Sequence, residues 1–546
     1  MKNKWILALS LMLAIGTASA QNLYDAERLS SNDLNGTARF VGMGGAMGAL
    51  GGDISTIGTN PAGIGIFRSS DVSVTLGYNN TGASAKFMGT KMNEDKSRAS
   101  FDQIGFVYSN KIGNTTSLRY VNFGFNYHKS KNFNRIFSMG GALDGYSQTW
   151  QMTRALENVN ITESELNDIF ESDGNPYTSS AYAEFPVLGI MGIRTGLVGW
   201  EANSHLGYDS PAGWNGTGNN FFSEEKGGIS EYDFNISFNL NDRVYLGLTL
   251  GAYDVKYDRY TSYTENLMGY QSADGSIWSI QDDGDVPVDN GGYTLDNYYR
   301  LEGAGIDLKL GAIIRPIEES PFRFGFAIHT PTWYDLSESY NASLSSDIYA
   351  FDDREIKPFE KQTLSDYLGG DYLNYDYRIY TPWKFNVNMG TTIGTALALG
   401  AEYEFEDYST AKLKDVDGYD LGDQKSVNTY LKGVHTARIG LEYRIVPEFS
   451  FRAGYNFSSR AYYESAYNAL APYSTNTAYL NLKDKQSITC GVGYRGSVFY
   501  ADLAYKYDTY RSAFFAFDDD IDGQFLPQTD INHSRHQLLF TLGARF

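Results

Sequence analysis

The chain ends with the stretch HQLLFTLGARF, residues 536–546. Side chains in a β-strand point alternately to its two faces. One face of this stretch is entirely apolar and the other is mostly polar or small. The apolar face holds Leu538, Phe540, Leu542, Ala544 and Phe546, and the other face holds Gln537, Thr541, Gly543 and Arg545. The stretch therefore predicts a final strand with one greasy face and an aromatic residue at its end.

The same alternation recurs upstream in RLEGAGIDLKLGAII, FRFGFAIH, HTARIGLEYRI and FSFRAGYNF. In each of them the face opposite the apolar side chains carries glycine and charged residues instead of the Thr, Lys and Glu of a solvated sheet face. An apolar exterior around a polar interior is the arrangement of a membrane-spanning barrel, and segments of about 10 residues suit a tilted transmembrane strand. A soluble sheet with its apolar face turned to a core is the competing interpretation.

Counting such segments back from 535–546 to 71–80 predicts fourteen strands. Their connections alternate between short ones, such as 446–448, and long ones, such as 331–377. Short periplasmic turns and long external loops are typical of outer-membrane barrels, and an even strand number places both ends of the barrel on one side. The sequence therefore predicts an all-β fold, a 14-stranded antiparallel transmembrane β-barrel over residues 71–546.

The interval 131–228 is too long for an ordinary loop. It contains an expected helix at Ser164–Ser172 and an apolar run at Phe185–Trp200. The run could be one more pair of strands, which would give sixteen, or part of a loop that folds over the mouth of the pore. We favour the loop.

Residues 1–20 have the features of a cleaved signal peptide: Lys2 and Lys4, then an apolar run, then Ala18-Ser19-Ala20. No other stretch approaches the roughly 20 apolar residues of a spanning helix. Together with the strand pattern, this predicts a protein exported to the outer membrane of a Gram-negative cell, with outer-membrane lipid around it.

The chain has 546 residues, a net charge of −21 and a single cysteine, Cys490. The acidic balance argues against nucleic acid as a partner, because phosphates require a basic surface. One cysteine permits no internal disulfide. None of the six histidines lies in a G-x-S-x-G or H-E-x-x-H context, so we expect no enzyme activity.

Residues 21–70 precede the first strand and are rich in glycine, with Asn60-Pro61-Ala62-Gly63 near their end. This segment is too broken to cross lipid. Irregular backbone at membrane depth is tolerated only inside protein or a water-filled cavity. We therefore expect residues 21–70 to fill the lumen as a plug, with glycines that allow positive φ and close packing.

The stretch FVGMGGAMGALGGDISTIGTNPAGIGIFRSS resembles the N-terminal hatch of the FadL/TodX family of outer-membrane transporters of long-chain fatty acids and hydrocarbons. The family pattern places a Gly-rich segment and an acidic residue, here Asp53, before Asn-Pro-Ala, here Asn60, Pro61 and Ala62. The segments FRFGFAIHTPTWYDLS, TPWKFNVNMGTTI, LALGAEYEFEDYS and RIGLEYRIVPEFSFRAGYNF resemble its strand pairs. The terminal Phe546 also agrees with the signal that barrel assembly machinery reads, which makes that machinery an expected partner.

The resemblance implies a monomeric passive transporter of fatty-acid-like or other apolar molecules, without a cofactor. Its gate would be the hatch at Asp53, Asn60, Pro61, Ala62 and Gly63. The cargo would leave sideways through the wall at a kinked third strand. The candidates for that exit are Tyr120, Asn122, Gly124, Asn126 and His128, with Gly124 as the kink. A glycine in a strand often marks a bend, but Gly124 could equally make room in the lumen.

Three alternatives stay open at this point. The barrel could anchor a protein partner through its long loops, or it could bind haem through His128 and His329, which are both expected to face the lumen. The segment DDDIDG, with Asp518, Asp520 and Asp522, matches the first half of a calcium loop, although a solvated acidic loop is the favoured interpretation.

Overall fold

The structure is a computed structural model. It describes residues 22–546 except 172–173, 183, 202–208, 269, 272–276, 279–280, 283–286, 289–290, 353–354, 470–474, 476–478, 518–519 and 522–523. The predicted signal peptide, residues 1–20, lies outside the described residues, and so do Asp518 and Asp522 of the acidic segment.

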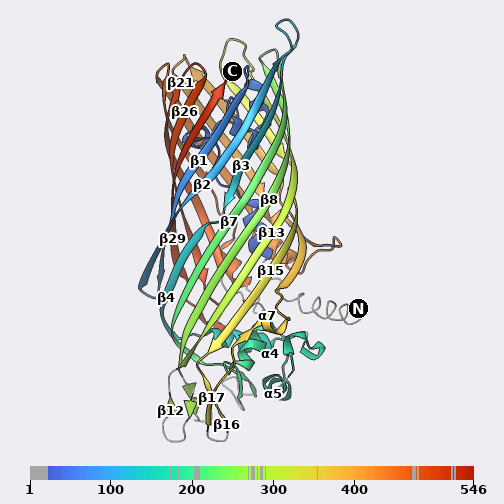
Figure 1. Ribbon diagram of the computed structural model, residues 1–546, viewed down its shortest axis with the longest axis vertical. Coiled ribbons are helices and arrows are strands. Elements are labelled where there is room, and N and C mark those ends of the chain that lie inside the picture. The colour runs from blue at the N-terminus through green and yellow to red at the C-terminus, as the bar shows by residue number, and fades with distance from the viewer. Residues whose placement is uncertain are drawn as a thin grey trace.

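Fourteen antiparallel strands close into one barrel, as the sequence predicted (Figure 1). The barrel closes where β1 (Asp71–Phe87) pairs with β29 (Thr529–Arg545) in an unbroken register. Two hydrogen bonds extend this pairing, from Ser70 N–H to the Phe546 carbonyl at 2.9 Å and from Phe546 N–H to the Ser70 carbonyl at 3.0 Å. The backbone of Phe546 thus forms the last pair of the β1–β29 ladder, with Ser70, and its side chain is exposed.

Ten of the wall strands are continuous and four consist of two segments each. The continuous ones are β1, β2 (Thr90–Lys111), β7 (Asn215–Leu240), β8 (Val244–Met268), β13 (Gly291–Ile314), β23 (Gly433–Val446), β24 (Phe449–Ser458), β25 (Tyr479–Arg495), β26 (Phe499–Phe515) and β29. The interrupted ones are β3 (Leu118–Asn132) with β4 (Arg135–Gly145), β14 (Arg323–His329) with β15 (Trp333–Ser346), β19 (Leu373–Tyr380) with β20 (Lys384–Ile393), and β21 (Leu397–Asp407) with β22 (Lys412–Asp415).

Two of these interruptions contain a Thr-Pro pair, at Pro331 and Pro382, and proline cannot donate to a ladder. Shorter elements lie in the connections. They are β5 (Gly199–Glu201), β6 (Ser210–Ala212), β9 (Tyr270–Gln271), β10 (Ile277–Trp278), β11 (Gln281–Asp282), β12 (Pro287–Val288), β16 (Tyr349–Asp352), β17 (Glu355–Pro358), β18 (Gln362–Thr363), β27 (Asp520–Ile521), β28 (Gln524–Phe525), α7 (Leu364–Tyr367), α8 (Gln424–Tyr430), η4 (Pro176–Thr178), η5 (Ser180–Tyr182), η6 (Tyr408–Thr410) and η7 (Glu464–Ala469).

The outer surface carries an apolar belt in the half of the barrel near the short turns. On β13, Ile306 and Leu310 are 54% and 53% exposed, whereas the alternating Lys309 is 2% exposed. Further along the same strand the outward residues become polar, at Glu302 and Arg300. A belt about ten residues deep on tilted strands matches the hydrocarbon layer. The wall is therefore a transmembrane barrel of the outer-membrane type, and its strands continue well beyond the belt.

No helix in the described part of the chain is both long and apolar enough to cross a bilayer.

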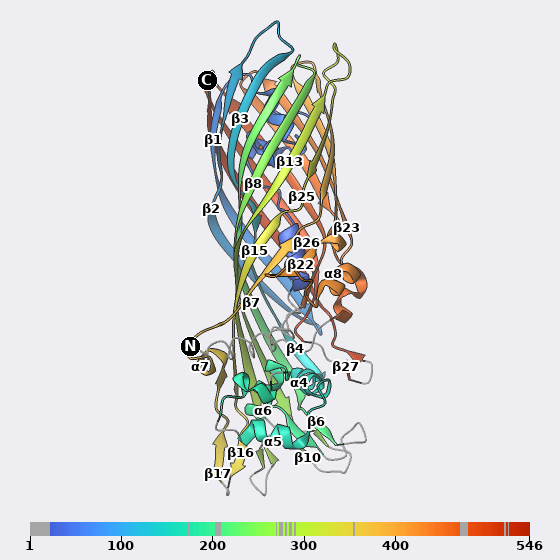
Figure 2. The same ribbon diagram turned by 90° about the vertical axis from the view of Figure 1, so that its right-hand side faces the viewer.

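A helical cap closes the end of the barrel away from the C-terminus (Figure 2). It consists of α4 (Gln148–Glu157), α5 (Glu163–Glu171) and α6 (Val187–Arg194). The predicted helix at 164–172 is thus confirmed as α5. The apolar run 185–200 forms α6 and adds no wall strand, so the count stays at fourteen and the strand-pair interpretation is wrong.

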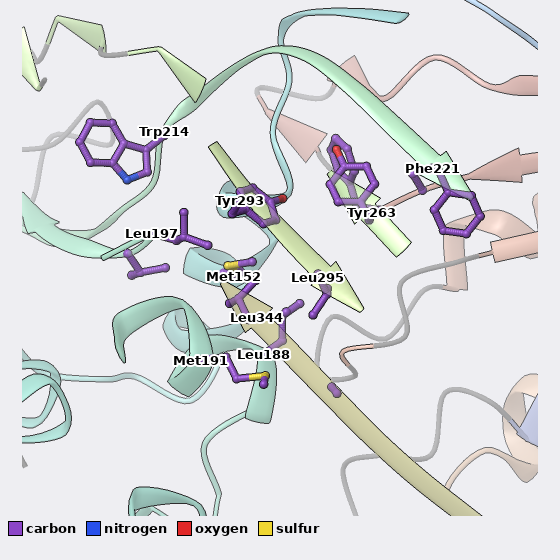
Figure 3. Close-up of a cluster of buried hydrophobic side chains, with 14 of the residues drawn as sticks. Met152, Leu188, Met191, Leu197, Trp214, Phe221, Tyr263, Tyr293, Leu295 and Leu344 are labelled. Carbon is purple, nitrogen blue, oxygen red and sulfur yellow. The ribbon is translucent and has the colours of Figure 1, made fainter. Parts of the chain in front are cut away.

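The cap is held by an apolar core that joins its helices to the inner face of the strand ends. Figure 3 shows Met152, Leu188 and Met191 from the helices beside Leu295 and Leu344 from the wall, all of them buried. The apolar surface of the cap therefore faces inward, into the mouth of the barrel, and not into the solvent.

Glu265 of β8 lies buried under the first turn of α4, beyond the apolar belt. Its Oε2 accepts hydrogen bonds from the hydroxyls of Tyr263 at 2.7 Å and Tyr293 at 2.8 Å, and from Gln148 N–H at 3.1 Å. Burial outweighs these donors and raises the pKa of Glu265 from 4.5 to about 7. Folding therefore favours the protonated carboxyl.

We predict that the cap loses stability as the pH rises from about 4.5 to about 7, by at most on the order of 3 kcal/mol. The sign follows because the unfolded carboxyl ionises first and the buried one resists. Glu265→Gln should remove most of this dependence, whereas Glu163→Gln, on the exposed face of α5, should keep it. Limited proteolysis of the cap across this pH range measures the effect, and equal profiles for all three proteins would contradict the assignment.

Candidate functional site

The N-terminal segment lies inside the barrel, where Figure 1 shows it as the blue elements enclosed by the wall. We call residues 22–70 the hatch segment. It contains α2 (Asn22–Ser30), α3 (Ala38–Gly42), η2 (Ile54–Gly58) and η3 (Pro61–Ile66). Helix α3 contacts β24, β25 and β26, while η3 contacts β3, β7, β8 and β13. These strands lie on different sides of the wall, so the hatch segment spans the lumen.

The Asn60-Pro61-Ala62 motif is the point where the hatch segment is bonded to one side of the wall. Asn60 caps η3 by accepting from Ala62 N–H at 3.2 Å, and its amide donates to the Ala312 carbonyl at 3.3 Å and to Asn388 Oδ1 at 3.2 Å. The Pro61 carbonyl accepts from Ser237 Oγ at 2.9 Å. These groups are buried, so the bonds face no competition from water.

Asp53 and Gly63 shape the hatch segment itself. Asp53 caps η2 through Ser55 N–H at 3.0 Å and accepts from Thr37 Oγ1 at 2.8 Å. Because Thr37 is also the N-cap of α3, this one carboxylate ties two turns together. Gly63 faces Thr56 closely enough that a Cβ would overlap its hydroxyl. Both residues therefore hold the internal geometry of the predicted gate.

The wall approaches the hatch segment through strand glycines. A Cβ at Gly440 would overlap the Met43 carbonyl, one at Gly400 the Ala46 carbonyl, and one at Gly311 the side chain of Asn60. Further glycines of this kind are Gly247, against Pro61, and Gly454, against Gly44. The hatch in turn uses positive φ at Gly44, Gly45, Gly51 and Gly52. Backbone therefore packs on backbone, which only glycine permits.

An ion network also fixes the hatch segment, and sequence reasoning did not predict it. Arg39 of α3 pairs with Glu442 through two bonds of 2.8 and 3.0 Å, and Arg452 joins Glu442 to Asp502 at 2.6 Å each. The alternating pattern of the strands did indicate part of this network, because it places Glu442 and Arg452 on the polar faces of their predicted strands. The partner Arg39 lies in α3, a helix of five residues, which is too short for a periodic pattern to point to it.

A cavity of about 150 Å³ lies between the hatch segment and the surrounding wall. Its lining carries eight basic residues and three acidic ones, in a chain whose net charge is −21. The basic residues are Arg28, Lys131, Arg135, Arg259, Arg460, Lys483, Lys485 and Arg535, and the acidic ones are Glu27, Asp33 and Glu225. The rest is largely apolar, including Phe133, Phe137, Tyr408, Val434, Leu480, Leu482 and Phe514. Such a lining suits an apolar body with an anionic group.

The wall beside this cavity has a seam, which we define as the junction between residues 90–102 of β2 and the strand formed by β3 and β4. The β2–β3 ladder covers only Gln103–Lys111 opposite His128–Tyr120. Residues 90–101 of β2 pair with β1, and β4 pairs with β7. Within the described residues, the ladder between these neighbouring strands therefore stops at His128.

Polar side chains close the seam in place of backbone bonds. Arg98 donates to Asn134 Oδ1 at 2.9 Å and lies 3.3 Å from Glu224, and Ser138 donates to Glu94 at 2.7 Å. A small pocket on this junction is lined by Arg135 and Glu225, which also line the larger cavity. The two residues pair at 2.6 Å and so stand between the cavity and the seam.

The predicted exit residues lie on β3, but the interruption is not at Gly124. Gly124 pairs with Val107 on one side and Asn235 on the other without a shift, and the irregularities in the β3–β7 register fall at Leu118/Tyr120 and Lys129/Lys131. A Cβ on Gly124 would lie 3.4 Å from Ile57 and 3.6 Å from Ile64 of the hatch segment, which is ordinary van der Waals contact. The two ladders therefore show no bulge at Gly124, and both interpretations of this glycine, a kink or room in the lumen, stay predictions.

The other predicted residues of β3 face the hatch segment or the lumen. Asn122 donates to the carbonyls of Ile64 at 2.7 Å and Phe67 at 2.9 Å, and Asn126 is buried beside Gln103. His128 lies inside, whereas Tyr120 is half-buried near the end of the strand. Asn122 therefore anchors the hatch segment to β3.

His128 and His329 do not form a haem site. His329 Nε2 lies 3.0 Å from the Thr59 carbonyl, and His128 packs near Gly58, so the hatch segment covers both rings. His128, Glu231 and Asp233 bring possible ligand atoms within 4.8 Å of one another. Lys309 already pairs with both carboxylates, at 2.6 Å from Asp233, so a basic side chain holds the place that a metal ion would take.

No family model and no curated protein matches the chain in sequence. In structure the chain is similar to a FadL homologue of Pseudomonas aeruginosa, with 11% identity, 94% of this chain and 99% of that chain covered, and a TM-score of 0.49. It is also similar to the toluene transporter TodX of Pseudomonas putida, with 12% identity, 94% and 99% covered and a TM-score of 0.45.

A third similar structure is the toluene transporter TbuX of Ralstonia pickettii, with 14% identity, 94% and 99% covered and a TM-score of 0.41. These proteins are of the kind that the hatch motif resembles.

We predict that Gly440→Ala forces the hatch segment away from β23, because its methyl group would overlap the Met43 carbonyl. Overpacking of this kind costs about 1–3 kcal/mol. The expected result is faster proteolysis of the hatch and higher ion conductance in planar bilayers. Gly82→Ala in β1 is the control, because its nearest neighbour is the flexible Ser534 hydroxyl at 3.3 Å. Indistinguishable conductance of the two variants would argue against the close packing.

Proposed function

We propose that the protein is a passive transporter of hydrophobic molecules through the outer membrane, and a member of the FadL/TodX family. The hatch segment acts as its gate and the seam as its lateral exit. The observation that carries the proposal is the cavity, which lies between the hatch segment and the wall and borders the seam at Arg135 and Glu225.

The chemistry of the cavity supports a cargo with an apolar body and an anionic group, such as a fatty-acid-like molecule. Aromatic and aliphatic side chains supply the apolar surface, and the excess of basic residues supplies charge for the head group. A sideways exit keeps such a molecule out of water, which would cost about 0.8 kcal/mol for each exposed CH₂. An axial exit would have to displace the whole hatch segment.

The proposal assigns the holding of the closed gate to the Asn60-Pro61-Ala62 end of the hatch segment. The Asn60-Pro61-Ala62 motif holds it against β7, β13 and β20 in the membrane-spanning half. The gate can move only if these buried hydrogen bonds break. The number of these bonds therefore sets the population of the open state in the protein without cargo.

We predict that Asn60→Ala raises the rate of uptake, because two buried hydrogen bonds to the wall are lost at a cost of about 1–3 kcal/mol to the docked hatch. That range corresponds to roughly 5- to 150-fold more of the open state. Uptake of a radiolabelled C12 carboxylate by vesicles that hold equal amounts of folded protein measures this. Asn80→Ala, on the outer surface, is the control. Unchanged uptake would remove the gating role from Asn60.

We predict that Arg98→Glu opens the seam, because it replaces a bond to Asn134 and places like charge beside Glu224. The pair is partly exposed, so we expect a gain in uptake of only about two- to fivefold. Arg300→Glu is the matched control, since Arg300 pairs with Asp258 on the outer face at 2.7 Å. If both variants transport alike, the exit lies elsewhere.

A stable protein partner that co-purifies with a transport-inactive barrel would favour a scaffold function instead.

A further inference from the structure

Residues 33–35 of the hatch segment bond to the edge of β3 where the wall ladder has stopped. Asp33 N–H donates to the Ser130 carbonyl at 2.8 Å, and Asn132 N–H donates to the Asp33 carboxylate at 3.0 Å. Asn35 Nδ2 donates to the Lys129 carbonyl at 3.0 Å. The hatch thus supplies partners to backbone groups that lie beyond the last β2–β3 pair, at Gln103 and His128.

The same short stretch reaches the other side of the seam. Asn35 Nδ2 also lies 3.0 Å from Asp102 Oδ1. Asp102 is the residue that β2 leaves out of its register with β1, between Phe101 and Gln103. A bulge of this kind re-aims a side chain, and here it turns the carboxylate into the lumen. Residues 33–35 therefore bridge the two edges of the seam from inside.

Asp33 also neutralises part of the basic lining of the cavity. Its carboxylate, 5% exposed, lies 2.5 Å from Lys485 Nζ and 2.9 Å from Arg535 Nη1. The nearby Lys131 donates to Ser31 Oγ at 2.6 Å and has no ion-pair partner among the described residues. Asp33 is thus the cavity-lining carboxylate of a cluster of three basic side chains, and the buried Asp508 also acts on Lys485 and Arg535.

We propose that Asp33 is the latch of the lateral exit, and that an anionic head group in the cavity releases it by taking its place on Lys485 and Arg535. The proposal rests on the proposed function, because it names how cargo opens that same exit. The incoming head group replaces Asp33 on Lys485 and Arg535, and the displaced carboxylate needs a new partner. Lys131 is close enough to interact with Asp33 and has no ion-pair partner among the described residues, so it can receive this carboxylate. The exchange then leaves no buried charge unpaired.

The geometry couples the exchange to the wall. Once residues 33–35 move out of place with the Asp33 carboxylate, Asn132 N–H and the Ser130 carbonyl lose their partners. The edge of β3 is then held to β2 only by the side-chain bonds of the seam. A neutral apolar molecule of the same length fits the apolar lining but has nothing to offer Lys485 or Arg535. The latch therefore distinguishes amphipathic anions from neutral hydrocarbons at the step of opening, and not only at the step of binding.

The test uses the full chain in lipid nanodiscs with three C12 probes: dodecanoate, dodecyl phosphate and dodecanol. Hydrogen exchange of the peptide that contains residues 129–135 reports on the latch. In the natural protein we expect both anions to speed exchange at least fivefold and dodecanol to leave it unchanged. A response to only one anion would narrow the head group to carboxylate or to phosphate.

Asp33→Asn removes the internal competitor while its shape stays similar. We expect fast exchange without any probe, dodecanoate affinity raised at least tenfold, and dodecanol affinity changed less than twofold. Lys485→Gln tests the other partner and should lower dodecanoate affinity about tenfold even if Asp33→Asn does not fold. Asp335→Asn, on the exposed outer face, is the control and should behave like the natural protein.

The outcomes separate the latch from transport. If dodecanoate fails to change exchange, and neither Asp33→Asn nor Lys485→Gln alters its affinity, while vesicles still take up cargo, the latch is overturned and the transporter stands. If exchange and affinity respond as expected but no cargo enters vesicles, the latch is supported and the transport proposal fails.

Discussion

A peptide group at membrane depth has no water to bond, so its N–H and C=O must find partners within the protein. This constraint explains the closure of β1 on β29, and the bonds that Phe546 adds to it. It also gives meaning to the seam, where β3 and β2 part. Side chains of β2, β4 and β7 and the stretch 33–35 of the hatch fill that gap, so the departure from regular pairing coincides with the part of the lumen that holds a cavity.

The plug and the wall depend on each other through glycine. Inward glycines of the wall, such as Gly400 and Gly440, bring two backbones to a separation that any side chain would prevent. Polar atoms of the irregular hatch then reach wall groups directly, as Asn60 reaches the Ala312 carbonyl. A plug of this kind is bonded and not merely inserted. Its release is therefore a matter of exchanging bonds, which suits a gate that must stay shut without cargo.

The sequence predicted the membrane-spanning half of each strand better than the rest. On β8 the alternation of Leu246, Leu248 and Leu250 with small inward residues is clear, and the predicted strand 243–257 covers it. Beyond Ala252 the contrast reverses, with charged residues outside and large aromatic ones such as Tyr257 inside. That pattern is typical of a strand in a soluble protein. A criterion based on outward apolar residues therefore could not predict the parts of the strands that extend beyond the membrane.

The site was predictable only where local chemistry carried it. The glycines and Asn60-Pro61-Ala62 predicted a plug that packs closely on the wall. In the structure these residues do contact the wall strands. The seam depends on which distant residues of β2 and β3 pair, and no local pattern reports that. Asp33 and Arg39 acquire their roles from partners several hundred residues away, at Arg535 and Glu442, so their importance appears only after the chain has folded.

The height of the seam has a consequence for how a molecule would reach the bilayer. Along β2 the outward side chains change from Phe101 to Ser97 and Asp95, so the ladder ends at the rim of the apolar belt. A slot at that level faces the polar boundary of the outer leaflet, not its oily middle. An amphiphile passing there could lower its tail into the leaflet while its charge never left the aqueous border, and it would arrive already oriented like the lipids around it.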